Sequence, residues 1–144
     1  MNLDFASVWE MISDIVPEND ALICGDEIIS WKDYDLQSSK IATALKNAGL
    51  GPNSKAGLYL NNSNEYLIGQ NAIFKIGGVP INVNYRYVAE ELIYLLDNSD
   101  SEAVFYHACY SSRIKEISGS LPNIKAWIEI ADGTKSEFED SLKF

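Results

Sequence analysis

The stretch FKIGGVPINVNYRYVAEELIYLLDNSDSEAVFY, from Phe74 to Tyr106, contains a complete strand–loop–helix–strand unit. The pair Gly77-Gly78 predicts the end of a preceding helix, because glycine readily takes the left-handed conformation that closes a last turn. A short apolar strand, Val79 to Val83, follows. The loop Asn84-Tyr85-Arg86 leads into a helix with leucines at helical spacing, and Ala103 to Tyr106 is a second apolar strand. This order predicts a parallel pair of strands joined by a crossover helix.

The residues before this unit predict a helix, a small hairpin and a second helix. Apolar residues recur at helical spacing from Phe5 to Ile15, so we expect an amphipathic first helix there. Two apolar runs, Ala21 to Cys24 and Ile28 to Ile29, flank a Gly-Asp turn and predict a hairpin. Ser30, with an aspartate three residues later, has the pattern of a capping box and predicts the start of a helix that Gly49 closes.

The alternation of strands and helices continues along the rest of the chain. Lys55 to Leu60 predicts a strand, and Asn62, with a glutamate three residues later, predicts the cap of the next helix. Ser111 or Ser112 begins a further helix, and Ala126 to Ile130 is predicted to be the last strand. From residue 131 to residue 144 the chain turns polar, and we expect a tail there.

Together these elements predict an α/β fold. Four strands alternate with three helices, and right-handed crossovers place such strands in a mostly parallel sheet with helices on both faces. The first helix and the small hairpin precede this sheet. A length of 144 residues suits one domain, and we expect residues 1–144 to form a single α/β domain.

The composition fits a folded protein and excludes some partners. Hydrophobic residues make up 47% of the chain and charged residues 22%, which argues against disorder. Eleven basic residues against twenty-one acidic ones give a net charge of −10, so the chain repels the backbone of a nucleic acid. No run of about 18 apolar residues predicts a membrane span, and the N-terminus lacks the basic start of a signal peptide. We expect a cytoplasmic protein.

The cysteines and the single histidine are too scattered for a zinc site. Cys24 and Cys109 are far apart, no CxxC motif is present, and His107 is the only histidine. We expect two buried free thiols in a reducing compartment.

Polar residues follow each predicted strand of the sheet. They are Asn61-Asn62, Asn84-Tyr85-Arg86, His107-Ala108 and Ala131-Asp132. In an open parallel sheet, ligands gather outside the carboxyl ends of the strands. The sequence therefore predicts any binding site at this edge.

The opening stretch, read as FKIGGVPINVNYRY..EEL.YLL..S...AVFY, carries a resemblance to a known family. Together with Ile29 to Tyr34 and Ala48 to Gly51, it resembles the early core of the AMP-forming acyl-CoA synthetases of the adenylate-forming superfamily. The likeness extends from about Phe5 to Ile130, and the Val-Asn-Tyr-Arg-Tyr wording is most similar to the fatty-acyl-CoA branch. The fold that this implies is the N-terminal subdomain of an adenylate-forming enzyme.

The resemblance implies an activity for a longer protein. Enzymes of this family join a fatty acid to the α-phosphate of ATP and pass the acyl group to CoA, releasing AMP and pyrophosphate with the help of Mg²⁺. The Ser/Thr/Gly-rich phosphate loop and the catalytic lysine of the family have no match in this sequence. We therefore expect an N-terminal fragment that supplies no catalytic residue, is inactive alone, and binds no cofactor by itself.

Arg86 is the leading candidate for a binding residue. A guanidinium recognises phosphate with planar, two-pronged hydrogen bonds, and the resemblance implies that this arginine contacts a phosphate of CoA, with Tyr85 and Asn84 in the same loop. The alternative is a structural ion pair with Glu90 or Glu91, one turn into the following helix.

The other polar and aromatic candidates have simpler explanations. Asn61 and Asn62 fit ligand contact or the capping of the next helix. His107 fits a titratable group, but no nucleophile accompanies it, which favours a structural histidine. The resemblance allows three tyrosines to line an acyl tunnel, whereas aromatic groups more often pack in a core; these are Tyr85, Tyr87 and Tyr94.

A second function, of another class, also fits the sequence. The chain can be a non-catalytic binding or assembly module that pairs with a separately encoded remainder of the enzyme. A sheet that lacks its neighbours leaves an edge or an apolar face uncovered, which favours self-association.

Overall fold

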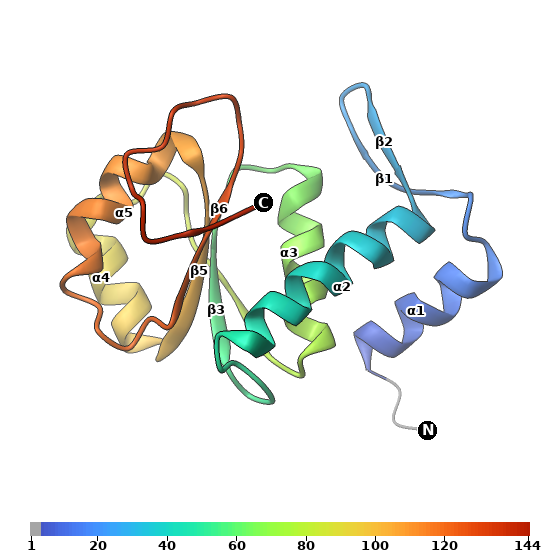
Figure 1. The fold of residues 1–144 in the computed structure, drawn as a ribbon, viewed down its shortest axis with the longest axis horizontal. Coiled ribbons are helices and arrows are strands. Elements are labelled where there is room, and N and C mark those ends of the chain that lie inside the picture. Colours follow the sequence, from blue (N-terminus) through green and yellow to red (C-terminus); the bar gives the residue numbers. More distant parts are fainter. Residues whose placement is uncertain (1–3) are drawn as a thin grey trace.

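A computed structural model describes residues 4–144 of the chain and shows a five-stranded, all-parallel sheet (Figure 1). The strand order is β4-β3-β5-β6-β7, with a separate two-stranded hairpin, β1-β2. The strands are β1 (Asp20–Cys24), β2 (Glu27–Ser30), β3 (Lys55–Tyr59), β4 (Val79–Asn82), β5 (Ser101–His107), β6 (Ala126–Ile130) and β7 (Leu142–Lys143). The helices are α1 (Phe5–Ile15), α2 (Trp31–Asn47), α3 (Asn64–Lys75), α4 (Ala89–Asn98) and α5 (Ser111–Ser118), with a short 3₁₀ turn at Ala108–Tyr110.

The predicted fold class is confirmed, with one change in strand order. Helices cover both faces of the sheet, α2 and α3 on one side and α4 and α5 on the other (Figure 1). β4 and β5 are parallel and connected through α4, as predicted, but they do not pair. β3 lies between them and is hydrogen-bonded to both. The predicted parallel strands with their crossover helix are therefore present, and the place of β3 between them is what the sequence did not predict.

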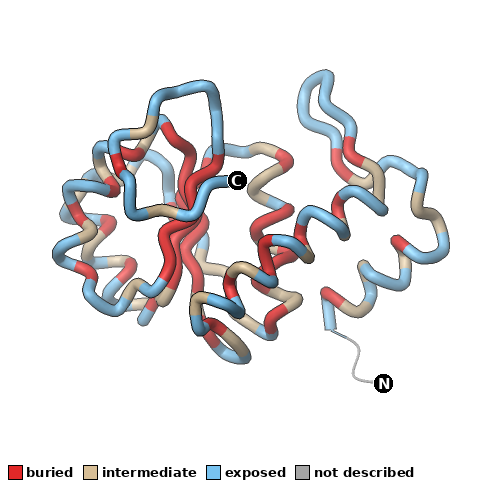
Figure 2. Tube along the Cα trace, viewed as in Figure 1, coloured by how far each residue is buried: buried red, intermediate tan, exposed pale blue. Residues whose placement is uncertain are grey.

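Alternate side chains of each strand build two separate hydrophobic cores. Leu58, Phe105 and Ile128 face α2, α3 and the hairpin, whereas Tyr59 and Tyr106 point to the opposite side, toward α4 and α5. In Figure 2 the buried residues accordingly concentrate along the strands and on the inward faces of the helices. Burial of both strand faces explains why these strands read as continuous apolar runs.

The first helix and the hairpin pack at the outer side of α2 and α3 (Figure 1). The predicted hairpin is confirmed, with Ile23 paired opposite Ile28. The α1 helix is also confirmed, but much of its apolar face lies in solvent, since Phe5 is 64% and Ile15 75% exposed. Lys75 of α3 anchors this helix through an ion pair with Glu10.

The two ends of α3 show one corrected and one confirmed prediction. Ser63, not Asn62, caps the start, because the Ser63 hydroxyl accepts the amide of Tyr66 at 3.3 Å. At the other end Gly77 has φ +72°, and the amide of Gly78 reaches the carbonyl of Ile73 at 2.9 Å. This pair of glycines closes the helix as the sequence predicts.

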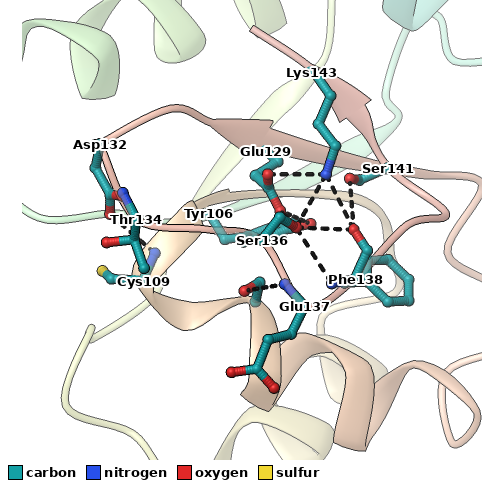
Figure 3. Close-up of polar contacts among 11 residues, drawn as sticks. Tyr106, Cys109, Glu129, Asp132, Thr134, Ser136, Glu137, Phe138, Ser141 and Lys143 are labelled. Carbon is teal, nitrogen blue, oxygen red and sulfur yellow. Dashed lines mark hydrogen bonds and ion pairs between the residues drawn. The ribbon is translucent and has the colours of Figure 1, made fainter.

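The segment 131–144 folds back over the sheet instead of remaining a bare polar tail. It ends in β7, which pairs in parallel with β6, so β6 is not the last strand. The anchor is Glu129 of β6, a carboxylate only 5% exposed. It accepts hydrogen bonds from Lys143 at 2.8 Å, Ser136 at 2.5 Å and Tyr106 at 3.0 Å (Figure 3). Phe138 adds an edge-on contact with the Trp127 ring.

Candidate functional site

The loop after β4 presents Arg86 on a tightly bonded backbone. The side-chain oxygen of Asn84 accepts the Arg86 amide at 2.9 Å, and the Asn84 carbonyl accepts the Tyr87 amide at 3.0 Å. The Val88 amide donates to the Glu91 carboxylate at 2.9 Å, at the start of α4. The main chain around Arg86 is therefore held by its own neighbours, and only its side chain extends into solvent.

The structural alternative for Arg86 is not observed. Within residues 4–144 its guanidinium makes no ion pair with Glu90 or Glu91, and Glu91 is instead engaged by the Val88 amide. The Arg86 guanidinium carbon lies 5.5 Å from the ring centre of Tyr85. This arrangement leaves a charged fork beside an aromatic ring, which suits a phosphate or a planar anionic group.

A second arginine reaches the same loop from α5. Nη1 of Arg113 donates to the Tyr87 carbonyl at 2.8 Å and to the Tyr59 hydroxyl at 3.2 Å. The Tyr59 hydroxyl in turn donates to the same carbonyl at 3.3 Å. Burial raises the pKa of Tyr59, and the Arg113 hydrogen bond only partly offsets this, so the hydroxyl keeps its proton at neutral pH. Sequence reasoning missed Arg113, because its partner on the loop is a backbone carbonyl.

The ends of β3 and β5 meet at a polar cluster beside this loop. Nδ1 of His107 accepts the Asn61 amide at 3.2 Å, and the Asn61 side chain accepts the Tyr110 hydroxyl at 2.7 Å. Burial lowers the pKa of His107, although Glu65 and Asp132 act in the opposite direction. His107 is thus a neutral, hydrogen-bonded group. Its contact agrees with the structural interpretation, while the proposed capping by Asn61 and Asn62 is wrong.

The end of β6 is occupied by a structural carboxylate. Asp132 accepts the Cys109 amide and the Thr134 amide, each at 2.9 Å (Figure 3). Burial alone raises the pKa of Asp132, but these hydrogen bonds outweigh it and hold the pKa well below its usual range. Cys109 and Cys24 are both free thiols as predicted, yet both are exposed, so the prediction of buried thiols was wrong.

The tyrosines around the loop do not form a core. Tyr94 is 71% exposed, and Tyr85 also lies largely in solvent, so core packing is wrong for both. Tyr87 is half-buried against the α4–α5 side of the sheet. The acyl tunnel stays a prediction.

Residues 4–144 provide neither a cluster of metal ligands nor a membrane-spanning helix. No group of three or more His, Cys, Asp and Glu side chains within residues 4–144 is placed to hold a metal ion. Over the same residues no helix has both the length and the apolar character needed to cross a membrane.

Comparison with known proteins places the chain among adenylate-forming proteins. The family model described as AMP-binding enzyme matches residues 13–143. A medium/long-chain-fatty-acid–CoA/3-oxocholest-4-en-26-oate–CoA ligase of Mycobacterium marinum is 37% identical over 94% of this chain and 25% of its own length. A 3-oxocholest-4-en-26-oate–CoA ligase of Rhodococcus rhodochrous is 35% identical over 96% of this chain and 25% of its own length. The chain thus spans about a quarter of the length of the curated relatives that it matches.

Solved structures share the fold at lower sequence identity. Acetoacetyl-CoA synthetase from Streptomyces lividans superimposes with a TM-score of 0.88 at 20% identity, over 98% of this chain and 24% of that one. The N-terminal domain of FACL13 from Mycobacterium tuberculosis gives a TM-score of 0.80 at 20% identity, over 88% of this chain and 34% of that one.

Proposed function

The chain belongs to the AMP-binding enzyme family, and from this premise we propose that it is part of an AMP-dependent fatty-acyl-CoA synthetase. The reaction converts ATP, a fatty acid and CoA into acyl-CoA, AMP and pyrophosphate. The observation that carries the proposal is the 37% identity over nearly the whole chain with a relative named as a fatty-acid–CoA ligase. This likeness supports the reaction class for a protein longer than these 144 residues.

Within that enzyme we assign this chain a supporting part in CoA binding. The Arg86 guanidinium has no acidic partner within residues 4–144, so it fits a phosphate of CoA. Tyr85 offers its ring beside the guanidinium. Asn84 contributes through the turn that it closes with the Arg86 amide, rather than through a side chain open to ligand.

ATP and Mg²⁺ are assigned to parts of the enzyme outside this chain. The described residues provide no carboxylate cluster that fits Mg²⁺, and no phosphate loop occurs in the sequence. We propose that no residue of the chain is catalytic and that the polypeptide alone is inactive. An ATP–pyrophosphate exchange assay with added fatty acid is expected to give the blank rate, and exchange above the blank refutes this part of the proposal.

The reaction class itself is tested on the longest gene product that contains these residues. Purified protein is expected to release AMP only when ATP, fatty acid and CoA are all present. Arg86→Met is expected to raise KM for CoA about tenfold while KM for ATP stays unchanged, because one charge-assisted contact contributes about 1.5–3 kcal/mol. Lys135→Met, at an exposed lysine without an ion pair, is the control for removing a positive charge. AMP release that is independent of CoA contradicts the proposal.

The alternative, an assembly module without catalysis, is favoured by the exposed apolar side chains. Phe5 and Ile15 of α1, with Ile23 and Ile28 of the hairpin, are exposed, and both elements lie on the α2–α3 side of the sheet (Figure 1). Such a surface favours self-association or pairing with a separate chain. Sedimentation analysis tests this assembly role. A chain that stays monomeric at all concentrations up to about 100 μM contradicts an open apolar interface with affinity in the micromolar range.

A further inference from the structure

The chain contains two arginines, and both lie at the loop Asn84–Val88. Arg86 belongs to the loop, and Arg113 reaches it from α5 with a hydrogen bond to the Tyr87 carbonyl. Neither guanidinium forms an ion pair with a carboxylate within residues 4–144. Five of the nine lysines, by contrast, pair with acidic side chains.

The contacts of Arg113 form a closed triangle. Its Nη1 donates to the Tyr87 carbonyl and the Tyr59 hydroxyl, and that hydroxyl donates to the same carbonyl. The carbonyl thereby receives two donors, one for each lone pair. Tyr59 is fully buried at the end of β3, where the ring of Tyr110 packs at 4.7 Å between centres. One corner of the triangle is therefore fixed to the sheet.

The loop is held at one end by the triangle and along its length by its own hydrogen bonds. The amides of Arg86, Tyr87 and Val88 each have an acceptor within the loop or at the start of α4. None of these bonds attaches the loop to the sheet. Two donors on the Tyr87 carbonyl, one residue from Arg86, attach the loop: Arg113 of α5 and the Tyr59 hydroxyl of β3.

We propose that Arg113, acting together with Tyr59, is a positioning residue that fixes the Asn84–Val88 loop and thereby the direction in which Arg86 meets its anion. The inference rests on the proposed function for the identity of that anion, a phosphate of CoA. Arg86 supplies the charge that the ligand contacts. Arg113 supplies the geometry, so that ordering of the loop is completed before the ligand arrives.

The experiment compares substitutions that differ in whether they touch the loop. Arg113→Met keeps the aliphatic stem and removes the donors, and Tyr59→Phe removes one hydroxyl from the triangle. Tyr110→Phe is the matched control, because its hydroxyl lies on the neighbouring, packed ring but donates to Asn61 instead. Arg113→Lys restores a single donor for the carbonyl. All variants are made in the 144-residue chain for hydrogen exchange and in the longest gene product that contains it for ligand binding.

Two readouts are taken on each variant. The first is hydrogen exchange of the Arg86, Tyr87 and Val88 amides by NMR, compared with amides of β5 as an internal reference. The second is binding of adenosine 3′,5′-bisphosphate, the phosphorylated end of CoA, measured by titration. For Arg113→Met and Tyr59→Phe we expect loop exchange to rise about tenfold, equivalent to about 1.4 kcal/mol, while β5 amides change less than twofold. On a logarithmic scale, the rise in loop exchange for Arg113→Lys is expected to be less than half of the rise for Arg113→Met.

The outcomes separate this inference from the proposed function. Unchanged loop exchange in Arg113→Met and Tyr59→Phe, or a rise equal to that in Tyr110→Phe, overturns the positioning role. A rise spread equally over loop and β5 amides also overturns it, because it indicates only global destabilisation. If the longest gene product that contains these residues binds no bisphosphate while loop exchange responds as expected, the assigned CoA contact fails and the positioning of the loop stands.

Discussion

Replacing Lys143 with methionine tests whether Glu129 anchors the segment 131–144 to the sheet. Lys143 donates to the Glu129 carboxylate at 2.8 Å and also to the Ser136 hydroxyl and the Phe138 carbonyl (Figure 3). A hydrogen bond to a charged group contributes about 1.5–3 kcal/mol, and removing one partner of a fully buried ion pair costs about 3–5 kcal/mol. Because the Lys143 side chain is half exposed, water partly replaces the lost donor. We therefore expect Lys143→Met to lower the free energy of unfolding by about 2 kcal/mol, near the low end of these values.

Urea unfolding followed by tryptophan fluorescence measures this loss. Trp127 contacts Phe138 of the same segment, so its emission reports both the segment and the sheet. With an m-value of about 2 kcal/mol/M, the midpoint is expected to fall by about 1 M urea. Lys135→Met removes the same charge from an exposed side chain of the segment and is expected to change stability by less than about 0.5 kcal/mol. Equal midpoints for the two variants refute the anchoring role of Glu129.

The pH dependence provides an independent check on the same carboxylate. Burial alone raises the pKa of Glu129, but the hydrogen bonds from Lys143, Ser136 and Tyr106 outweigh it and leave the pKa below its usual value. A carboxyl with a lowered pKa in the folded state stabilises the protein above its unfolded pKa, and this contribution is lost as the pH falls. The stability difference between the unsubstituted chain and Glu129→Gln is therefore expected to shrink from pH 7 to pH 4. A difference that stays constant over this range contradicts the assignment.

Two further predictions concern packing and thiol chemistry. A Cβ added at Gly69 lies 3.2 Å from the buried Phe105 ring. Alanine favours a helix over glycine by about 1 kcal/mol, but the crowding is expected to outweigh this gain, so Gly69→Ala is expected to lower the free energy of unfolding in urea by about 1 kcal/mol. A stabilised variant refutes the close packing. Both Cys24 and Cys109 are exposed, so an aromatic disulfide reagent is expected to modify two thiols of the folded chain at pH 8. Burial and Asp132 raise the pKa of Cys109 to about 11, so this thiol is expected to react in a separate, slow phase that Cys109→Ser removes.

The sequence predicted the elements well because each depends on local patterns. Residues within a few positions of an element specify its ends and its type. Examples are the glycines at the ends of α2 and α3, the Ser30 cap and the apolar runs of the strands. The cap of α3 failed for the same local reason, since residues 61–64 read Asn-Asn-Ser-Asn and all four are good capping residues. Only the packing of the following helix selects Ser63.

Features that depend on distant partners could not be read from the chain. β3 lies between β4 and β5 and is hydrogen-bonded to both, an arrangement that no local pattern in its own sequence specifies. Glu129 in the run Ala-Trp-Ile-Glu-Ile reads as an outward residue of a strand, because two of its three donors, Ser136 and Lys143, come from a segment whose sequence reads as a polar tail. Arg113 was hidden because its acceptor on the loop is a backbone carbonyl, which every residue has.

The charge arrangement explains why the unpaired arginines are informative. Five lysines have carboxylate partners, namely Lys32, Lys55, Lys75, Lys125 and Lys143. With nearly two acidic residues for every basic one, acidic partners are abundant in this chain, yet neither arginine pairs with one within residues 4–144. At long range the net charge of −10 repels a polyanionic nucleotide, but this repulsion is screened beyond about 8–10 Å at physiological salt. Capture of such a ligand therefore depends on cations that no acid neutralises, held where the ligand arrives. The loop around Arg86, fixed by Arg113, is the part of the described chain that meets both conditions.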